Sequence, residues 1–168
     1  LYQLVDFYTL FYFKFIKNNR YGDEHFWLNS LNSPMFNIWS GLSFELLCMM
    51  HITQLKETLG ISGVQTRVCS WRSKGCDSGA DSHEGAQIDL LIDRKDETVN
   101  ICEIKYYKEQ FEISKDYCER LQNKLNIFAK ETKTNKSLLL TMITANGIKH
   151  NSHSDIIQEE ITLEDLFK

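Results

Sequence analysis

Two apolar runs separated by a charged turn, within residues 86–106, constrain the fold of this chain more than any other feature. The first run, QIDLLID, and the second, TVNICEIKY, are rich in β-branched and aliphatic residues, whereas the RKDE between them is typical of a tight turn. The pattern predicts a β-hairpin with strands over 86–93 and 98–106. Such a hairpin must belong to a larger sheet with a covering layer, because two strands alone are marginally stable in water.

Alternation along each strand sorts the hairpin side chains into two faces. The first strand is expected to present one face made of Gln87, Asp89, Leu91 and Asp93, and an opposite face made of Ile88, Leu90 and Ile92. If Leu91 pairs with Ile101 on the second strand, the same register places Asp89 directly opposite Glu103. Lys105 follows two residues further along the face of Glu103, so the three charged groups are expected to gather at one end of the hairpin.

Two facing carboxylates among aliphatic residues destabilise a purely structural sheet, and a cation between them removes the conflict. Mg²⁺ takes carboxylate oxygens and keeps several waters, and Lys105 is close enough to contact such a water or a phosphate oxygen. A metal, carboxylates and an ammonium group are what hydrolysis of a phosphodiester requires. The alternative is a surface hairpin on which Asp89, Glu103 and Lys105 are exposed and unconnected.

A long helix is predicted upstream, over roughly 36–59, beginning after Pro34 and ending at Gly60. At 100° per residue, Glu45 falls on an apolar stripe made of Ile38, Leu42, Met49 and Ile52. A carboxylate there needs a partner, and the site of Asp89 and Glu103 is one candidate. Pairing of Glu45 with Arg67, Arg72 or a backbone group is the other.

The remaining segments complete an α/β pattern. They predict an aromatic helix over 2–17, a strand near 64–71, a helix over 109–132, a strand over 137–145, and a closing strand and helical turn. The order is α-α-β-β-β-α-β with a small C-terminal α/β element, and a sheet with helices on its faces accommodates it. The 2–17 helix is expected to be buried on most sides, and the 137–145 strand is expected to be central.

The charge of the chain argues against an autonomous nucleic-acid binder of high affinity, because the formal net charge is −4 at pH 7 and such domains are usually basic. The distribution of charge qualifies this. Residues 105–136 hold eight Lys/Arg against five Asp/Glu, whereas residues 61–104 hold five against eight. A basic segment beside a carboxylate-rich one is expected where a site attracts phosphate, and an evenly solvated helix face is the alternative.

The five cysteines are odd in number and scattered, which predicts reduced thiols in a cytoplasmic protein. Cys69, Cys76 and His83 are spaced too widely for a compact zinc motif. The most apolar run, residues 1–16, is too short to span a bilayer and is interrupted by charged side chains. Because Leu1 stands where an initiator Met is expected, the chain is expected to be a piece of a longer protein.

A helical Glu, an Asp on the second strand and an (E/D)-x-K on the third together resemble the PD-(D/E)XK nuclease superfamily, whose core runs α-β-β-β-α-β. The matching segments are GLSFELL with Glu45, GAQIDLLID with Asp89, and CEIKY with Glu103 and Lys105. The resemblance implies a restriction-endonuclease-like α/β fold, with Mg²⁺ or Mn²⁺ bound by Asp89, Glu103 and the carbonyl of Ile104. Lys105 would stabilise the transition state or position water, and Glu45 would hold a water of the metal or a second ion.

More closely, the chain resembles the C-terminal nuclease-like domain of bacterial and archaeal ATP-binding proteins of the archaeal-ATPase, AAA-type group. The resemblance spans nearly the whole chain, in the phrases FNIWSGLSFE, GISGV, SW, GAQIDLLIDR, ICEIKY and ITLEDLF. It implies that a P-loop ATPase and a winged-helix domain belong to the same full-length chain. The superfamily's proline is replaced by Ile88, and no GxxxxGK[ST] loop occurs here, so no ATP site is expected in this sequence.

The resemblance therefore implies a metal-dependent DNA endonuclease domain of a larger ATP-binding protein. Residues 1–35 are expected to form a helical linker or docking segment, and residues 36–168 the nuclease-like domain. The first alternative is a catalytically inactive module of the same fold that binds DNA or protein and is coupled to an ATPase. The second is a protein-binding domain that uses its aromatic N-terminal helices. The complete set of charged residues favours the enzyme, and the negative net charge favours the inactive module.

Overall fold

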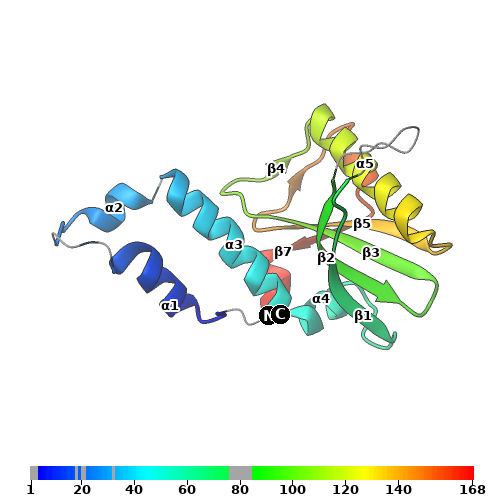
Figure 1. Cartoon of the computed structure of the whole chain (residues 1–168), viewed down its shortest axis with the longest axis horizontal. Helices are drawn as coiled ribbons and strands as arrows, with labels where there is room; N and C mark the ends of the chain where they lie inside the picture. The colour runs from blue at the N-terminus through cyan, green and yellow to red at the C-terminus, as the bar shows by residue number, and fades with distance from the viewer. Residues whose placement is uncertain (1–3, 18, 20–21, 32, 76–84) are drawn as a thin grey trace.

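A five-stranded mixed sheet forms the centre of the structure, a computed structural model that describes residues 4–17, 19, 22–31, 33–75 and 85–168 (Figure 1). The strand order is β1-β2-β3-β5-β7. The strands are β1 (Thr66–Arg72), β2 (Gln87–Arg94), β3 (Thr98–Lys105), β5 (Ser137–Thr144) and β7 (Glu159–Thr162). Strand β2 is antiparallel to both β1 and β3, whereas β3, β5 and β7 run parallel to one another. The predicted α/β class is thus confirmed, and the predicted central position of the 137–145 strand is confirmed as well.

The hairpin of β2 and β3 has the predicted register over most of its length. Leu91 pairs with Ile101, and the antiparallel ladder runs from Asp93–Val99 to Leu90–Cys102. It ends one pair before Asp89 would meet Glu103, so the direct pairing of these two residues is not part of the ladder. The two strands therefore stop pairing at the end that carries the predicted site.

Helices cover both faces of the sheet, as Figure 1 shows. Helix α5 (Lys115–Thr132) links β3 to the parallel β5 and packs on one face through Leu121 and Phe128, against Leu91 and Ile101. Helices α3 (Pro34–Met50) and α4 (Ile52–Thr58) pack on the other face, where a second apolar cluster contains Phe44, Cys48, Leu55, Leu90, Cys102 and Ile104. Parallel strands require such a crossover, and a sheet covered on both faces explains the near-continuous apolar runs of β3 and β5.

Local signals fix the ends of the helices. Ser33 caps α3 by accepting a hydrogen bond from the Phe36 N–H, with Pro34 in the first turn, and Gly60 follows α4 at a φ of 67°. The predicted single helix over 36–59 is interrupted at His51, which separates α3 from α4. The predicted 109–132 helix begins later, because Phe111–Glu112 form a short strand, β4, that pairs with β6 (Ile148–Lys149). Ser114 then caps α5.

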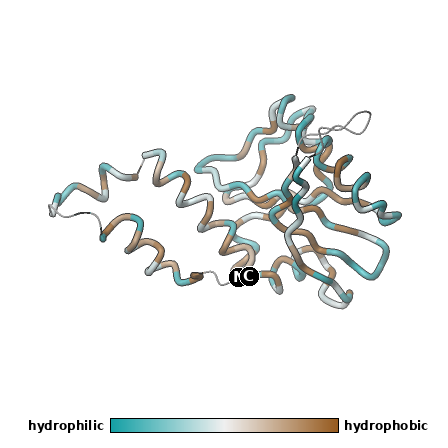
Figure 2. Tube along the Cα trace, in the orientation of Figure 1, coloured by the Kyte–Doolittle hydropathy of each residue, from teal (hydrophilic) through white to brown (hydrophobic). Residues whose placement is uncertain are grey.

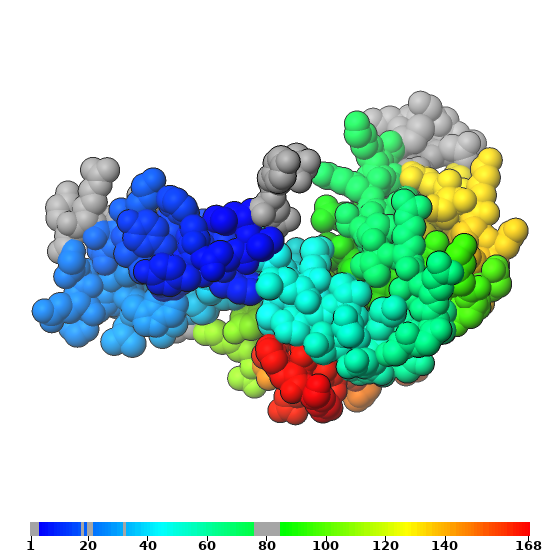
Figure 3. All heavy atoms as spheres, turned by 90° about the horizontal axis from the view of Figure 1, so that it is seen from below, coloured from blue at the N-terminus to red at the C-terminus, as the bar shows by residue number. Residues whose placement is uncertain are grey.

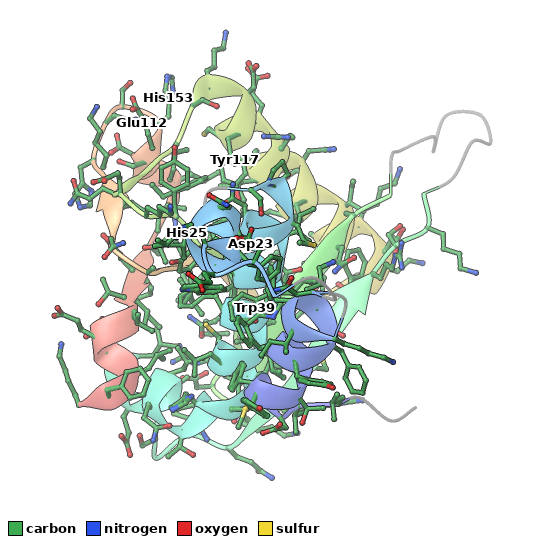
Figure 4. The ribbon with its side chains drawn as sticks, turned by 90° about the vertical axis from the view of Figure 1, so that its left-hand side faces the viewer. Asp23, His25, Trp39, Glu112, Tyr117 and His153 are labelled. Carbon is green, nitrogen blue, oxygen red and sulfur yellow. The ribbon has the colours of Figure 1, made fainter. Side chains whose placement is uncertain are left out.

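The N-terminal residues form a helical arm that extends away from the sheet (Figures 1 and 3). It consists of α1 (Phe7–Phe11), a π-helical turn (Tyr12–Ile16) and α2 (Phe26–Ser30), joined to the first half of α3. The elements are held by edge-to-face and tilted aromatic contacts among five rings, those of Phe11, Phe15, Trp27, Phe36 and Trp39. Figure 4 shows Trp39 where α1 and α3 meet.

The expectation that the first helix is buried on most sides is wrong. Within the described part of the arm only Phe15, at 1% exposure, and Ser30 are buried, whereas Tyr8 and Phe13 are 70% and 51% exposed. The reason is that the arm packs on α3 alone and gains no second covering layer from the sheet. Figure 2 shows hydrophobic residues along α1 and along α3. The division at residue 35 stays a prediction, since α3 contributes to the arm and to the sheet core.

The C-terminal segment closes the sheet edge as predicted, with β7 followed by a 3₁₀ helix, Leu163–Phe167. Four cysteines lie in the described residues, and all are free thiols: Cys48, Cys69, Cys102 and Cys118. Burial raises the pKa of the Cys48 and Cys102 thiols to about 12, so both stay protonated at neutral pH. In the described parts of the chain, no helix is long and apolar enough to cross a bilayer.

Candidate functional site

A β-bulge in β2 lies at the position of Asp89. Cys69 of β1 pairs with Leu91 and Trp71 pairs with Ile88, so β2 has one residue more than β1 over this step. The bulge breaks the alternation predicted for β2, because Ile88 packs in the same cluster as Leu91 under α5 instead of sharing the face of Leu90. The face prediction for Ile88 is therefore wrong. Bulges bend a strand and re-aim its side chains, and they are frequent beside functional sites.

Glu103 is the most buried carboxylate of the group, with a residue exposure of 4%. One of its oxygens accepts a hydrogen bond of 2.8 Å from the Tyr117 hydroxyl and lies 3.1 Å from the Lys105 Nζ, and the other lies 2.5 Å from the Lys124 Nζ. Burial alone would raise the pKa of Glu103, but Lys124 and Lys105 outweigh it and hold that pKa below its ordinary value. Glu103 is thus an anion at neutral pH, fixed in place by three donors.

Asp89 lies beside this network in a different electrostatic setting. Burial raises the pKa of its carboxyl group, and the negative charge of Glu103 raises it further, while Lys105 and Lys124 act in the opposite direction. Its nearest hydrogen-bond donor is the amide of Gln87, at 3.3 Å. Asp89, Glu103 and Lys105 line one hollow of about 290 Å³ between the open end of the hairpin and α5. The predicted gathering of these three residues on one face is confirmed.

Glu45 approaches the same end from the opposite face of the sheet, on α3. Burial raises the pKa of the half-buried carboxyl group, the charges of Asp89 and Glu103 raise it further, and Lys105 lowers it. Lys105 is thus the cation whose charge acts on Glu45, although it does not offset the burial and the neighbouring carboxylates. The carboxylates of Glu45, Asp89 and Glu103 and the ammonium group of Lys105 thus converge from α3, β2 and β3, at the point where β2 and β3 no longer pair.

The predicted apolar stripe around Glu45 is wrong for three of its four residues, because only Ile52 packs against the core. Ile38, Leu42 and Met49 are 62%, 61% and 42% exposed, so that face of α3 does not enter the core. The face that packs on the sheet carries Phe44 and Cys48, one helical turn apart. Glu45 flanks this inner stripe, and that position brings its carboxylate to the end of the hairpin.

Helix α5 supplies residues that the sequence analysis missed. Tyr117 and Lys124 bind Glu103, and Arg120 places its guanidinium carbon 5.1 Å from the centre of the Tyr117 ring. Tyr117, Leu121, Lys124 and Phe128 recur at helical spacing on one stripe, so a lysine in the middle of an apolar stripe was the available signal. Figure 4 shows Tyr117 projecting from the beginning of α5.

The donor set suits a hard divalent cation bound by few protein ligands. In the residues that the structure describes, no group of three or more His, Cys, Asp or Glu side chains is arranged to hold a metal together. Two carboxylates, those of Asp89 and Glu103, and the backbone carbonyl of Ile104 remain the predicted ligands, and Glu45 would then act through water. Mg²⁺ commonly binds through one or two carboxylates and keeps several waters. The crowded negative charge on Asp89 and Glu45 fits such an ion.

The zinc alternative falls largely outside the described residues, since Cys76 and His83 are not among them. Comparison of the chain with protein-family models, with curated proteins and with solved structures found no match.

Proposed function

We propose that this chain is a Mg²⁺-dependent phosphodiester hydrolase domain that acts on DNA as an endonuclease. The observation that carries the proposal is the convergence of Glu45 from α3, Asp89 from the bulge in β2, and Glu103 with Lys105 from β3. Like charges gathered at the end of a sheet are unfavourable for stability, and such arrangements cluster at functional sites. Manganese could replace magnesium, because both prefer oxygen ligands.

The architecture supports the resemblance to the PD-(D/E)XK superfamily. With the short α4 and β4 set aside, the elements α3, β1, β2, β3, α5 and β5 come in the order α-β-β-β-α-β of that superfamily's core. Each of the four proposed residues also occupies the kind of element that the superfamily uses for it. Fold likeness alone does not specify chemistry, so the site residues carry the argument.

The chain's own residues would divide the work as follows. Asp89, Glu103 and the carbonyl of Ile104 would bind the ion, which would activate a water molecule and neutralise charge on the phosphate. Lys105 would stabilise the developing negative charge on the phosphate oxygens or orient the attacking water. Glu45 would hold a water of the ion or a second ion. Tyr117 and Lys124 keep the Glu103 carboxylate in a fixed orientation.

Cleavage of supercoiled plasmid DNA in Mg²⁺ or Mn²⁺ tests the proposal. The chain should convert the plasmid to nicked and linear forms, and Glu103→Ala and Lys105→Ala should each lower the rate by about 10²-fold or more. Asp93→Ala is the matched control, because Asp93 lies at the opposite end of the same hairpin, next to the turn. Absence of metal-dependent cleavage on single-stranded, duplex and branched DNA, in the full-length protein as well, would refute the hydrolase.

One observation favours a second candidate, a module that binds DNA or protein without cleaving. Both oxygens of Glu103 already have donors in Lys124, Tyr117 and Lys105, as in a structural charge network. The exposed Tyr8 and Phe13 of the arm support the further proposal that P-loop ATPase and winged-helix domains of the same full-length chain pack there. DNA binding that is unchanged by divalent ions, together with no cleavage, would favour this module over the enzyme.

A further inference from the structure

Three surface hollows follow one another across the candidate site. The first, of about 470 Å³, lies between the end of β1 and the start of β2. It shares Gly85, Ala86 and Gln87 with the hollow of the candidate site. That hollow in turn shares Arg120 and Asn123 with a third one along the first turns of α5. Because neighbouring hollows share lining residues, the three form a row that passes over Asp89 and Glu103 and continues on both sides of them, and we call this row the groove.

Cations line this groove on both sides of the carboxylates. Arg72 and Lys74 line its first part and are exposed at the end of β1. Arg120 and Lys124 line the part along α5, where Arg120 is exposed and Lys124 is half-buried. These groups lie on one path although the whole chain carries a net charge of −4. A local stripe of positive charge attracts a polyanion even when the net charge is negative.

Close backbone packing shapes the first part of the groove. The Ser73 N–H donates a hydrogen bond of 2.8 Å to the Ala86 carbonyl, and the Ser73 hydroxyl donates one to Glu131 of α5. A Cβ on Gly85 would lie 3.0 Å from the Ser73 carbonyl oxygen, so glycine permits this close approach. These hydrogen bonds fix the position of Ser73, and with it the backbone that carries Arg72 and Lys74 at the end of β1.

The third hollow marks where the basic path ends. Beyond Arg120 and Asn123 it is lined by Asp116 and Glu119, which would repel phosphates. Arg120 itself lies over the Tyr117 ring, and Tyr117 binds Glu103, so this guanidinium has a defined position next to the site. The positive part of the groove therefore runs from Arg72 to Arg120, with the candidate site between them.

We propose that one nucleic-acid strand lies along this groove, with Arg72 and Lys74 binding backbone phosphates on one side of the candidate site and Arg120 on the other. The inference rests on the proposed function, and it extends that function by assigning the residues that bind the strand. Contacts on both sides of the site would favour an internal phosphodiester as the substrate. The contacts are to phosphates, so they are expected to be independent of base sequence and sensitive to salt.

Binding of a fluorescein-labelled 20-nucleotide single strand, and of the matching duplex, tests the strand path in Ca²⁺ and in EDTA over a series of salt concentrations. Arg72→Ala/Lys74→Ala should weaken binding roughly tenfold or more near 0.1 M salt and reduce the slope of log K against log salt by about 1.5. Arg120→Ala should weaken binding roughly three- to tenfold, and Arg120→Lys should restore most of it. Lys95→Ala/Lys149→Ala, a charge-matched control at exposed positions outside the groove, should bind as the wild type does.

The possible outcomes separate the strand path from the hydrolase proposal. Weaker binding by the groove variants, with no cleavage by any protein, supports the strand path while the hydrolase fails. Cleavage by the wild type, with groove variants that bind and cut like the control, overturns the strand path and leaves the hydrolase standing. Absence of binding to either probe by the wild type overturns the strand path, as does an equal loss of affinity in the groove variants and the control.

Discussion

The two ends of the β2–β3 hairpin carry similar charged residues in opposite arrangements. Next to the turn, two acids each have their own cation: Asp93 lies 2.6 Å from the Lys136 Nζ, and Asp96 binds the guanidinium of Arg94. At the open end, Asp89 and Glu103 face Glu45 from the neighbouring helix, and the lysines of that region are concentrated on Glu103. At the turn end, Asp93 and Asp96 are each paired with a cation. At the open end, the carboxylates of Asp89 and Glu45 lie close to other carboxylates.

The pKa directions express this difference. The hydrogen bond from Arg94 lowers the pKa of Asp96, whereas burial and then the charge of a neighbouring carboxylate raise the pKa of Asp89 and of Glu45. Both ends belong to one hairpin of one sheet, so membership of the sheet does not by itself require the crowding. Paired opposite charges, as at the turn end, contribute to stability. Neighbouring like charges, as at the open end, are typical of positions where a ligand or a reaction uses the charge.

The largest effect is expected from removing Glu103, which organises the open end. Glu103→Ala leaves Tyr117 and Lys124 without their acceptor, and the Lys124 side chain is only 19% exposed. We expect the free energy of unfolding to fall by about 3 kcal/mol, as when one partner of a buried ion pair is removed. Urea denaturation measures it, with Glu103→Gln as the control that preserves an acceptor for Tyr117. A loss below about 1 kcal/mol, the range of exposed pairs, would show that this network is solvated.

A divalent cation should stabilise the open end and leave the turn end unaffected. If the proposed ion binds the folded chain and not the unfolded one, Mn²⁺ or Ca²⁺ at 100 times its dissociation constant should raise the free energy of unfolding by about 2.7 kcal/mol. Thermal unfolding with and without EDTA measures the effect. Asp89→Asn should abolish it, and Asp93→Asn should retain it. A shift that survives Asp89→Asn would place the ion elsewhere on the chain.

Neutralising a crowded carboxylate should stabilise the metal-free chain. The folded-state pKa of Asp89 is raised above its ordinary value of 3.8, so the folded chain binds more protons than the unfolded chain between these two values. Stability therefore falls as the pH rises through that window, and the full penalty applies above the folded-state pKa. Asp89→Asn should raise the free energy of unfolding by roughly 0.5–2 kcal/mol at pH 7 in EDTA, and the gain should vanish below pH 3.8.

Glu45→Gln should likewise raise the free energy of unfolding at pH 7, because the folded-state pKa of Glu45 is raised above 4.5 by burial and by Asp89. Urea denaturation from pH 3.5 to pH 7 compares both variants with the wild type. If instead the wild type gains stability relative to Asp89→Asn as the pH rises, Asp89 is a matched charge and the contrast between the two ends of the hairpin fails.

The hairpin and the order of elements were predictable because they depend on local patterns. Alternating apolar residues around RKDE give β2 and β3 in the predicted register, and Leu91 pairs with Ile101 as expected. Gly60 and Pro34 mark the boundaries of the paired helices α3 and α4. Each of these signals lies within a few residues of the feature it predicts, so tertiary structure does not override it.

The parts of the site that the sequence did not reveal depend on contacts between distant segments. The bulge at Asp89 follows from how β2 pairs with β1 on one side and β3 on the other, which periodicity within β2 cannot show. Lys124 and Tyr117 meet Glu103 across the interface of α5 with the sheet. The stripe of Ile38 and Leu42 failed for a related reason, since helical spacing identifies an apolar face without showing whether the fold covers it.

The smallest effect is expected at the turn end, where Asp93→Ala removes one matched pair. The Lys136 and Asp93 side chains are 23% and 39% exposed, and Lys136 keeps a second acceptor in the Arg94 carbonyl, 2.6 Å away. We therefore expect a loss of about 0.5 kcal/mol in the free energy of unfolding, reduced further at high salt. A double-mutant cycle with Lys136→Ala measures the coupling. A coupling above about 2 kcal/mol would exceed the range of exposed pairs, and would mean that the turn end, like the open end, depends on a buried charge network.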